Sequence, residues 1–95
     1  MYTIYVVFKC HPGKREAFVE RVNAEGIRAA VLAEKGCHRY DYYLSAQDAS
    51  ELLLVEAWET KEDQQVHLTQ PHMDTLRAFK GDYIETTTLG EFEIK

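Results

Sequence analysis

The sequence predicts an α+β fold of the ferredoxin-like split βαβ type, in which helices cover one face of an antiparallel sheet. Strand-like and helix-like segments alternate along the chain in the order β-α-β-β-α-β. The chain has 95 residues, of which 45% are hydrophobic and 28% charged, which is ordinary globular composition. At this length we expect residues 1–95 to form a single domain.

The first half of the chain predicts a strand and an interrupted helix. Residues 2–10 (YTIYVVFKC) are rich in β-branched and aromatic residues, and the following Pro-Gly pair ends the strand. A helix is predicted from 14 to about 34, with an apolar stripe of Phe18, Val22, Ala29 and Leu32. Gly26 costs this helix about 1 kcal/mol relative to Ala, so we expect a break there, and Gly36 is expected as a left-handed cap.

The second half predicts a hairpin, a broken helix and a last strand. Residues 37–44 and 51–59 read as strands on either side of a polar turn. Thr60 is a predicted N-cap for a helix to about Leu68, and Pro71 suits the first turn of another helix over 71–80. The last strand is predicted over 82–94, with Gly90 as a bulge or bend.

Both sides of the central strands are apolar, which predicts a partner. Ile4, Val6 and Phe8 face one way, and Tyr5 and Val7 face the other. A strand that is apolar on both sides requires cover on both faces, whereas the helices of this fold cover one. We therefore expect a homodimer packed through the sheet face. Cys10 and Cys37 would then lie at opposite ends of the sheet, too far apart to bridge.

Charge and composition exclude several classes of partner. The formal net charge of −5 argues against nucleic acid and anionic membrane, because both select for basic patches. No apolar run reaches bilayer length, and Met1 leads directly into a strand. Two cysteines without a CxxC spacing indicate reduced thiols. We expect a cytoplasmic protein with no membrane contact.

The segment HLTQPHM (67–73) carries the two histidines of greatest interest. His67 and His72 are five residues apart, about 140° around a continuous helix, and no further ligand has metal-site spacing, so no metal is expected. A histidine at a helix C-terminus interacts favourably with the helix dipole, and this interaction explains His67 without any function. At a helix N-terminus His72 is favoured as the neutral imidazole that can accept a proton. Spacing alone leaves packing and chemistry equally open for His72.

Three side chains on the strands are candidates for a pocket. Glu56 and Trp58 share a face of the third strand with apolar residues, and Tyr40 lies on the second strand. Trp58 could be core or a flat wall for an aromatic ligand. The tyrosine could supply a phenol hydroxyl or simply lie on the surface. There is no GxGxxG, Walker loop or nucleophile elbow, so no nucleotide or flavin cofactor is expected.

Three stretches of the chain resemble the antibiotic biosynthesis monooxygenase (ABM) domain family. They are EKGCHRYDYY, VEAWETKEDQQVHLTQPHM and FKGDYIE, and they look especially like its small bacterial members described as quinol monooxygenases. The features that carry the resemblance are an E-x-G-C before the second strand, an E-x-W on the third and an H-x-x-x-P-H between the helices.

The resemblance implies a dimeric α/β barrel with a pocket between sheet and helices in each subunit. It implies oxidation of a quinol or polyphenolic aromatic by O2 with no metal, flavin or other prosthetic group. It makes His72 and His67 the catalytic candidates, and His72 is favoured as base because a helix N-terminus favours its neutral form. The substrate-binding candidates that it implies are Trp58, Glu56, Tyr40 and Met73.

Two alternatives stay open at this level. Haem-degrading relatives carry an Asn on the first strand and a haem-ligating His on the last helix; the first strand here has no Asn and the last helix has no His after His72, so haem cleavage is not expected. An isomerase of a small phosphorylated dicarbonyl would need cations near the pocket, for which Arg28, Arg39, Arg77 and Lys80 are available. A non-catalytic ligand-binding dimer would use the same residues as core.

Overall fold

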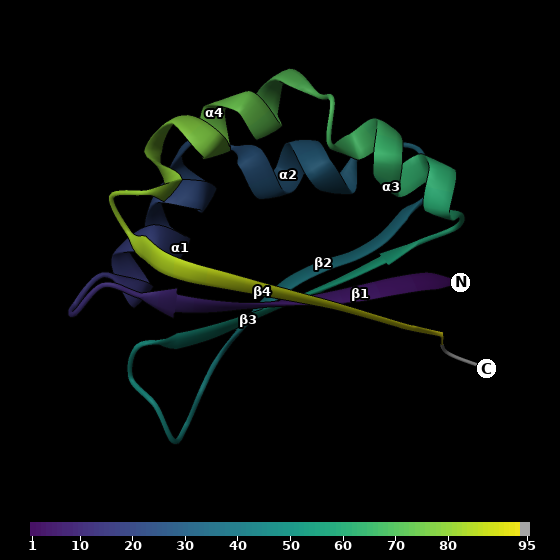
Figure 1. The fold of residues 1–95 in the computed structure, drawn as a ribbon. Helices are drawn as coiled ribbons and strands as arrows, with labels where there is room; N and C mark the ends of the chain where they lie inside the picture. Colours follow the sequence, from purple (N-terminus) through teal and green to yellow (C-terminus); the bar gives the residue numbers. More distant parts are fainter. Residues whose placement is uncertain (94–95) are drawn as a thin grey trace.

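A layer of helices covers one face of a four-stranded antiparallel sheet in the computed structural model, which describes residues 1–93 (Figure 1). The strand order is β2-β3-β1-β4, the ferredoxin-like arrangement that was predicted. The sheet is open, with β2 and β4 at its edges. In chain order the elements are β1 (Tyr2–Cys10), α1 (Arg15–Ala24), α2 (Ile27–Leu32), β2 (Cys37–Leu44), β3 (Glu51–Trp58), α3 (Lys61–His67), α4 (Pro71–Lys80) and β4 (Ile84–Glu93).

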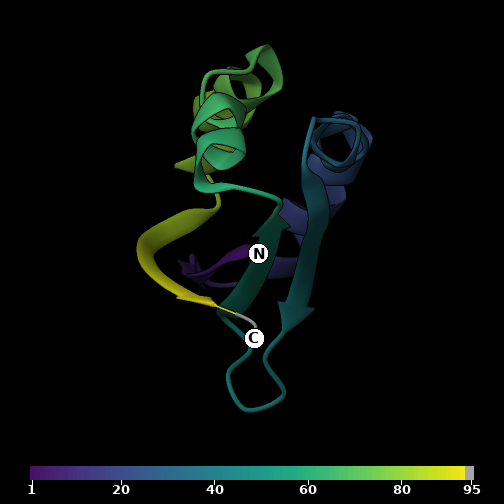
Figure 2. The ribbon, with the colours of Figure 1, turned by 90° about the vertical axis from the view of Figure 1, so that its right-hand side faces the viewer.

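The helices form two pairs on the same side of the sheet. Figure 2 shows α1 and α2 beside the β2 edge, and α3 and α4 standing next to them. The core lies beneath both pairs and includes Phe18, Trp58 and Phe79. This arrangement places the end of α2 opposite the junction of α3 and α4.

The first helical segment breaks where it was expected to, but its second half buries other residues than predicted. Gly26 adopts a left-handed φ of 70°, so α1 ends at Ala24 and α2 begins at Ile27. The break at this residue rotates α2 relative to α1, so different positions of the second helix face the core. Phe18 and Val22 of the predicted stripe are buried, whereas Ala29 and Leu32 are exposed, and Ile27 and Val31 take their place in the core.

Of the two alternatives predicted at Gly90, a bulge or a bend, the bulge is wrong. Pairing between β1 and β4 runs without interruption through this residue, and the register shifts at Lys9 and Cys10 instead. Gly90 lies opposite Tyr5, and a Cβ there would stand 2.2 Å from the tyrosine ring. The glycine is therefore required because an aromatic ring lies over it. The predicted end of the strand at Ile94 lies outside the described residues.

The α3–α4 junction explains why two short helices form instead of one. The Thr60 side chain accepts a hydrogen bond from the backbone N–H of Asp63, which confirms the predicted N-cap. The chain leaves α3 at His67 and turns through Gln70, whose ψ of 147° is extended. Pro71 then begins α4 at a position where its missing N–H costs no hydrogen bond.

The two faces of the sheet differ in their cover. On the helical side, Ile4, Val6 and Phe8 are almost fully buried. On the other side Tyr5 and Tyr43 are exposed. Both cysteines are free thiols. Among the residues that the structure describes, no helix is long and apolar enough to cross a membrane.

Gly36 should be far less tolerant of a side chain than Gly13. Both have a left-handed φ, of 79° and 72°, but a Cβ on Gly36 would lie 2.2 Å from the Asp63 carboxylate, whereas Gly13 faces open space. We expect Gly13→Ala to lower the free energy of unfolding by about 1 kcal/mol and Gly36→Ala by roughly 2–3 kcal/mol. Urea denaturation of both variants measures the difference, and equal losses would contradict the steric argument.

Candidate active site

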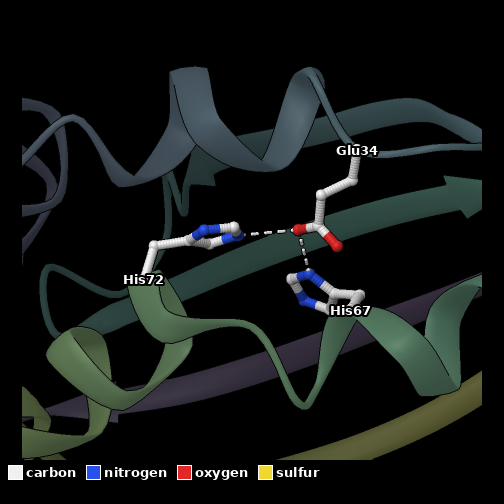
Figure 3. Close-up of side chains that lie close together, drawn as sticks. All are labelled: Glu34, His67 and His72. Carbon is white, nitrogen blue, oxygen red and sulfur yellow. Dashed lines mark hydrogen bonds and ion pairs between the residues drawn. The ribbon is translucent and has the colours of Figure 1, made fainter.

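The side chain of Glu34 connects the ends of two helices. Glu34 follows α2 and points toward the α3–α4 junction, where both imidazoles turn to meet it (Figure 3). Its Oε2 lies 2.8 Å from Nδ1 of His67 and 2.8 Å from Nε2 of His72. These three residues are referred to below as the Glu34 cluster.

The break between α3 and α4 is what brings the two histidines together. His67 is the last residue of α3 and His72 the second of α4, and their ring centroids are 6.4 Å apart. The sequence argument placed them about 140° apart on a continuous helix. That argument is wrong because the helix is not continuous, and both rings reach the same carboxylate oxygen.

Hydrogen bonding to one shared acceptor assigns the tautomers. An ionised Glu34 accepts from both rings, so His67 carries its proton on Nδ1 and His72 carries its proton on Nε2. Nδ1 of His72 then holds a free lone pair, and no described residue hydrogen-bonds to it. The His72 side chain is 20% exposed, against 1% for His67. His72 is thus the more accessible of the two histidines.

Burial keeps His67 neutral. Removal from water lowers the pKa of its imidazole, and the hydrogen bond to Glu34 opposes this shift without cancelling it. A neutral His67 with its proton on Nδ1 is a fixed donor to Glu34. It holds the carboxylate in place for His72.

A second carboxylate lies behind His67. Glu56 Oε1 is 3.8 Å from His67 Nε2 and accepts a hydrogen bond of 3.1 Å from Trp58 Nε1. Burial raises the pKa of Glu56 to about 7; the hydrogen bond from Trp58 opposes the rise, and the charge of Glu34 adds to it. Near neutral pH, therefore, both the protonated and the ionised form of Glu56 are populated.

The four residues predicted to bind substrate are buried, and three of them, Trp58, Tyr40 and Glu56, lie next to His67. The Trp58 ring is 4.8 Å from that of His67, and the Tyr40 ring is 5.8 Å from it. Burial raises the pKa of the Tyr40 phenol well above 10, so the hydroxyl stays protonated. Glu56 is 5% exposed and Met73 7% exposed, so no side chain of this group forms an open surface.

A cleft gives access to the cluster from outside. It has a volume of about 290 Å³ and is lined by Glu34, Lys35, Asp63, Val66 and Gln70. Glu34 therefore lines the cleft and also contacts the buried His67. A ligand in the cleft would meet Glu34 first.

Glu34 is the cluster member that the sequence argument did not select. It is the first residue of the E-x-G-C that precedes β2, so a signal was present in the resemblance. Nothing in helical or strand periodicity distinguishes it, because it lies in the link after α2. Its importance comes from contacts with residues 33 and 38 positions further along the chain.

The cations proposed for a phosphorylated substrate do not line this cleft. Arg28 donates to the Tyr40 carbonyl and to Asp41, and Arg77 to Asp74. Lys80 lies over the Phe8 ring. Lys35 is the basic residue that lines the cleft. The geometry therefore gives no particular support to the isomerase alternative.

Comparison with known proteins identifies the family. The family described as antibiotic biosynthesis monooxygenase matches residues 1–78. A Nitrosomonas europaea protein named as a candidate antibiotic biosynthesis monooxygenase is 27% identical with a TM-score of 0.87, covering 99% of this chain and 98% of its own. Rv0793 of Mycobacterium tuberculosis is 25% identical with a TM-score of 0.83, covering 99% and 94%.

More distant structures share the fold. A conserved protein of Methanosarcina mazei is 17% identical with a TM-score of 0.86, covering 99% of this chain and 92% of its own. No curated protein matches the chain. The family match spans well over half of the residues, and the strand order and helical cover agree with it. The chain belongs to the antibiotic biosynthesis monooxygenase family.

Proposed function

We propose that this chain is a monooxygenase that oxidises a quinol or polyphenolic aromatic with O2, using His72 as the base and no prosthetic group. The observation that carries the proposal is the Glu34 bridge, which leaves Nδ1 of the partly exposed His72 as a free proton acceptor. Family membership supports the monooxygenase reaction class, and the quinol substrate is our own extension.

The cluster is suited to removing a phenolic proton. A phenol near His72 gives its proton to Nδ1, and the resulting imidazolium is stabilised by the Glu34 carboxylate bonded to Nε2. His67 fixes that carboxylate from the opposite side. The phenolate left behind is electron-rich and reacts with O2 directly.

The reaction balances without an external reductant. The quinol anion transfers an electron to O2, and a bond forms between a ring carbon and oxygen, giving a peroxide. The imidazolium returns its proton to the distal oxygen of that peroxide. The O–O bond then breaks as the ring carbon loses its hydrogen as a proton. One quinol and one O2 yield one hydroxyquinone and one water.

The buried residues would form the inner wall of the substrate site. We propose that an aromatic ring enters beneath His72 by displacing the α3–α4 segment, and then rests on Trp58, with Tyr40 and Met73 beside it. Glu56 would lie at the back of this space, hydrogen-bonded to Trp58. Closure of the helices over the ring would exclude water from the phenolate.

We also propose that the chain works as a homodimer in the reducing cytoplasm. The open sheet face carries Tyr5, Val7, Leu53 and Val55, and a second copy packed sheet to sheet would cover them. The two free thiols suit a reducing compartment.

Substitution of His72 tests the base. With a panel of hydroquinones and a chelator present, we expect wild type to consume O2 and His72→Ala to lower the rate by about 10²–10⁴-fold, the range for loss of a general base. Glu34→Gln should also lower the rate, because the amide cannot stabilise the imidazolium. Oxygen-electrode measurements give these rates.

His38 provides a matched control for this experiment. It forms the other histidine–carboxylate pair of the described chain, with Glu59 at 2.6 Å, but both side chains are exposed and lie outside the cluster. His38→Ala should leave oxygen uptake unchanged. Equal rates for wild type and His72→Ala would contradict the mechanism. An aromatic ligand that raises the melting temperature without any oxygen uptake would indicate a binding protein instead.

Glu56 should make stability depend on pH. Its pKa is about 7 in the folded protein and 4.5 when unfolded, so the folded state holds a proton that the unfolded state releases between these values. The contribution of this group to stability is therefore greatest below pH 4.5 and falls as pH rises to 7. The shift corresponds to about 3 kcal/mol.

Glu56→Gln should remove this dependence while keeping the acceptor for Trp58. Urea denaturation at pH 4 and pH 8 measures it as the change in the difference between wild type and variant. Glu59→Gln, which alters an exposed carboxylate, serves as the control. A difference between wild type and Glu56→Gln that stays constant with pH would show that the Glu56 pKa is not raised.

Disruption of the open face tests the dimer. Leu53 lies on that face, and Leu53→Glu should convert dimers to single chains in analytical ultracentrifugation, because two carboxylates would be buried without partners. Leu68→Glu makes the same change at an exposed position after α3 and should leave the dimer intact. Wild type that sediments as single chains would refute the proposed assembly.

A further inference from the structure

We propose that Glu34, His67 and His72 also form a binding site for a divalent transition-metal cation of the zinc class. The ligating atoms of the three side chains all lie within 4.8 Å of one another. This inference goes beyond the proposed reaction, in which the same side chains handle a proton. It depends only on the geometry of the cluster.

The donor set is the one that such cations select. Two imidazole nitrogens and one carboxylate oxygen bind Zn²⁺ in many proteins, at about 2.0–2.2 Å from the ion. In the tetrahedral geometry of zinc, two ligands at that distance lie about 3.4 Å apart. Each imidazole nitrogen is 2.8 Å from the Glu34 oxygen. A cation can therefore replace the two shared protons with small side-chain movements.

A supporting carboxylate lies in the position that metal sites use. Histidine ligands usually donate their second N–H to a carboxylate, which fixes the ring and strengthens the metal bond. If His67 binds a cation through Nδ1, its proton moves to Nε2, which is 3.8 Å from Glu56 Oε1. Trp58 in turn holds Glu56. At 3.8 Å the pair is not hydrogen-bonded, so Glu56 would have to move closer by about 1 Å to support the bound ring.

Charge and access also fit a cation. Glu34 contributes one negative charge to the cluster, and Asp63 lines the same cleft. Glu34 lines this cleft, and the Glu34 and His72 side chains are 10% and 20% exposed, so an ion could meet Glu34 from the cleft before reaching the histidines. Three protein ligands leave a fourth position for water or a substrate oxygen, as in sites that are not purely structural.

Metal binding and base catalysis exclude each other at His72. A neutral imidazole carries one proton, and coordination through Nε2 forces that proton onto Nδ1. His72 then has no lone pair left to accept a phenolic proton. A bound cation should therefore inhibit the reaction; this consequence, unlike the site itself, rests on the proposed function.

Zinc titration of the full-length chain tests the site. Isothermal titration calorimetry should show one Zn²⁺ bound per chain in wild type. Glu34→Gln and His72→Ala each remove a ligand and should weaken binding by more than about 100-fold, since loss of a supporting residue alone costs 10–100-fold. Glu56→Gln removes a supporting residue only, so it should weaken zinc binding by about 10–100-fold.

Controls separate this site from incidental zinc binding. His38→Ala, which removes the exposed histidine paired with Glu59, and Cys37→Ser, which removes the less buried thiol, should bind Zn²⁺ as wild type does. Nitrogen-15 NMR of the imidazoles should show zinc-dependent shifts at Nδ1 of His67 and Nε2 of His72, with His11 and His38 unchanged. Glu34→Gln keeps the shape of the side chain, so its circular dichroism should match wild type.

The outcomes distinguish the two proposals. No zinc binding by wild type, or binding that Glu34→Gln and His72→Ala leave undiminished, would overturn the metal site. Zinc that binds and inhibits oxygen uptake, with a chelator restoring the rate, supports both proposals. Zinc that binds without inhibiting supports the site and contradicts His72 as the base. If no substrate is oxidised at all, the calorimetric result still decides the metal site alone.

Discussion

One carboxylate oxygen, Oε2 of Glu34, connects the parts of the helical layer that form the candidate site. It accepts from the last residue of α3 and the second residue of α4. The helix α3 has seven residues, too few to be stable alone, and depends on its Thr60 cap and on this contact. Hydrogen bonds to a charged acceptor contribute about 1.5–3 kcal/mol each. Loss of Glu34 would leave the Nδ1–H of His67, in a 1%-exposed side chain, without its partner.

The position of the helices separates the site from the face available to a partner. Glu34, His67 and His72 all belong to the helical side of the sheet, whereas Tyr5 and Leu53 lie on the other side (Figures 1 and 3). A second copy could cover the open face without touching the cleft beside Glu34. Alternate residues of β3 point to the helical side and to the open side of the sheet. Glu56 and Trp58 support the cluster, and the alternate residues Leu53 and Val55 face away from it.

Local signals in the sequence predicted most of the fold, and contacts distant in sequence decided the rest. The strands at 2–10 and 37–44 and the helix at 71–80 follow from period, composition and a proline, all local properties. The stripe through Ala29 and Leu32 was wrong because Gly26 changes the helical phase. His67 and His72 were recognised as important, but the prediction placed their rings on different sides of a continuous helix. It did not include the turn at Gln70, which brings both rings to the same carboxylate. Glu34 was not selected, because only the packed structure shows which side chains it contacts.

The two nitrogens of His72 link the two activities that we propose for the cluster. Proton acceptance uses Nδ1, which faces no described partner, and cation binding uses Nε2, which faces Glu34. Because the neutral ring has a single proton, occupation of one nitrogen determines the state of the other. His67 has no such freedom toward solvent, since its side chain is buried between Glu34, Glu56 and the Trp58 ring. The fold thus places one histidine in a buried position and the other in a partly exposed position, where the proposed proton transfer and cation binding would occur.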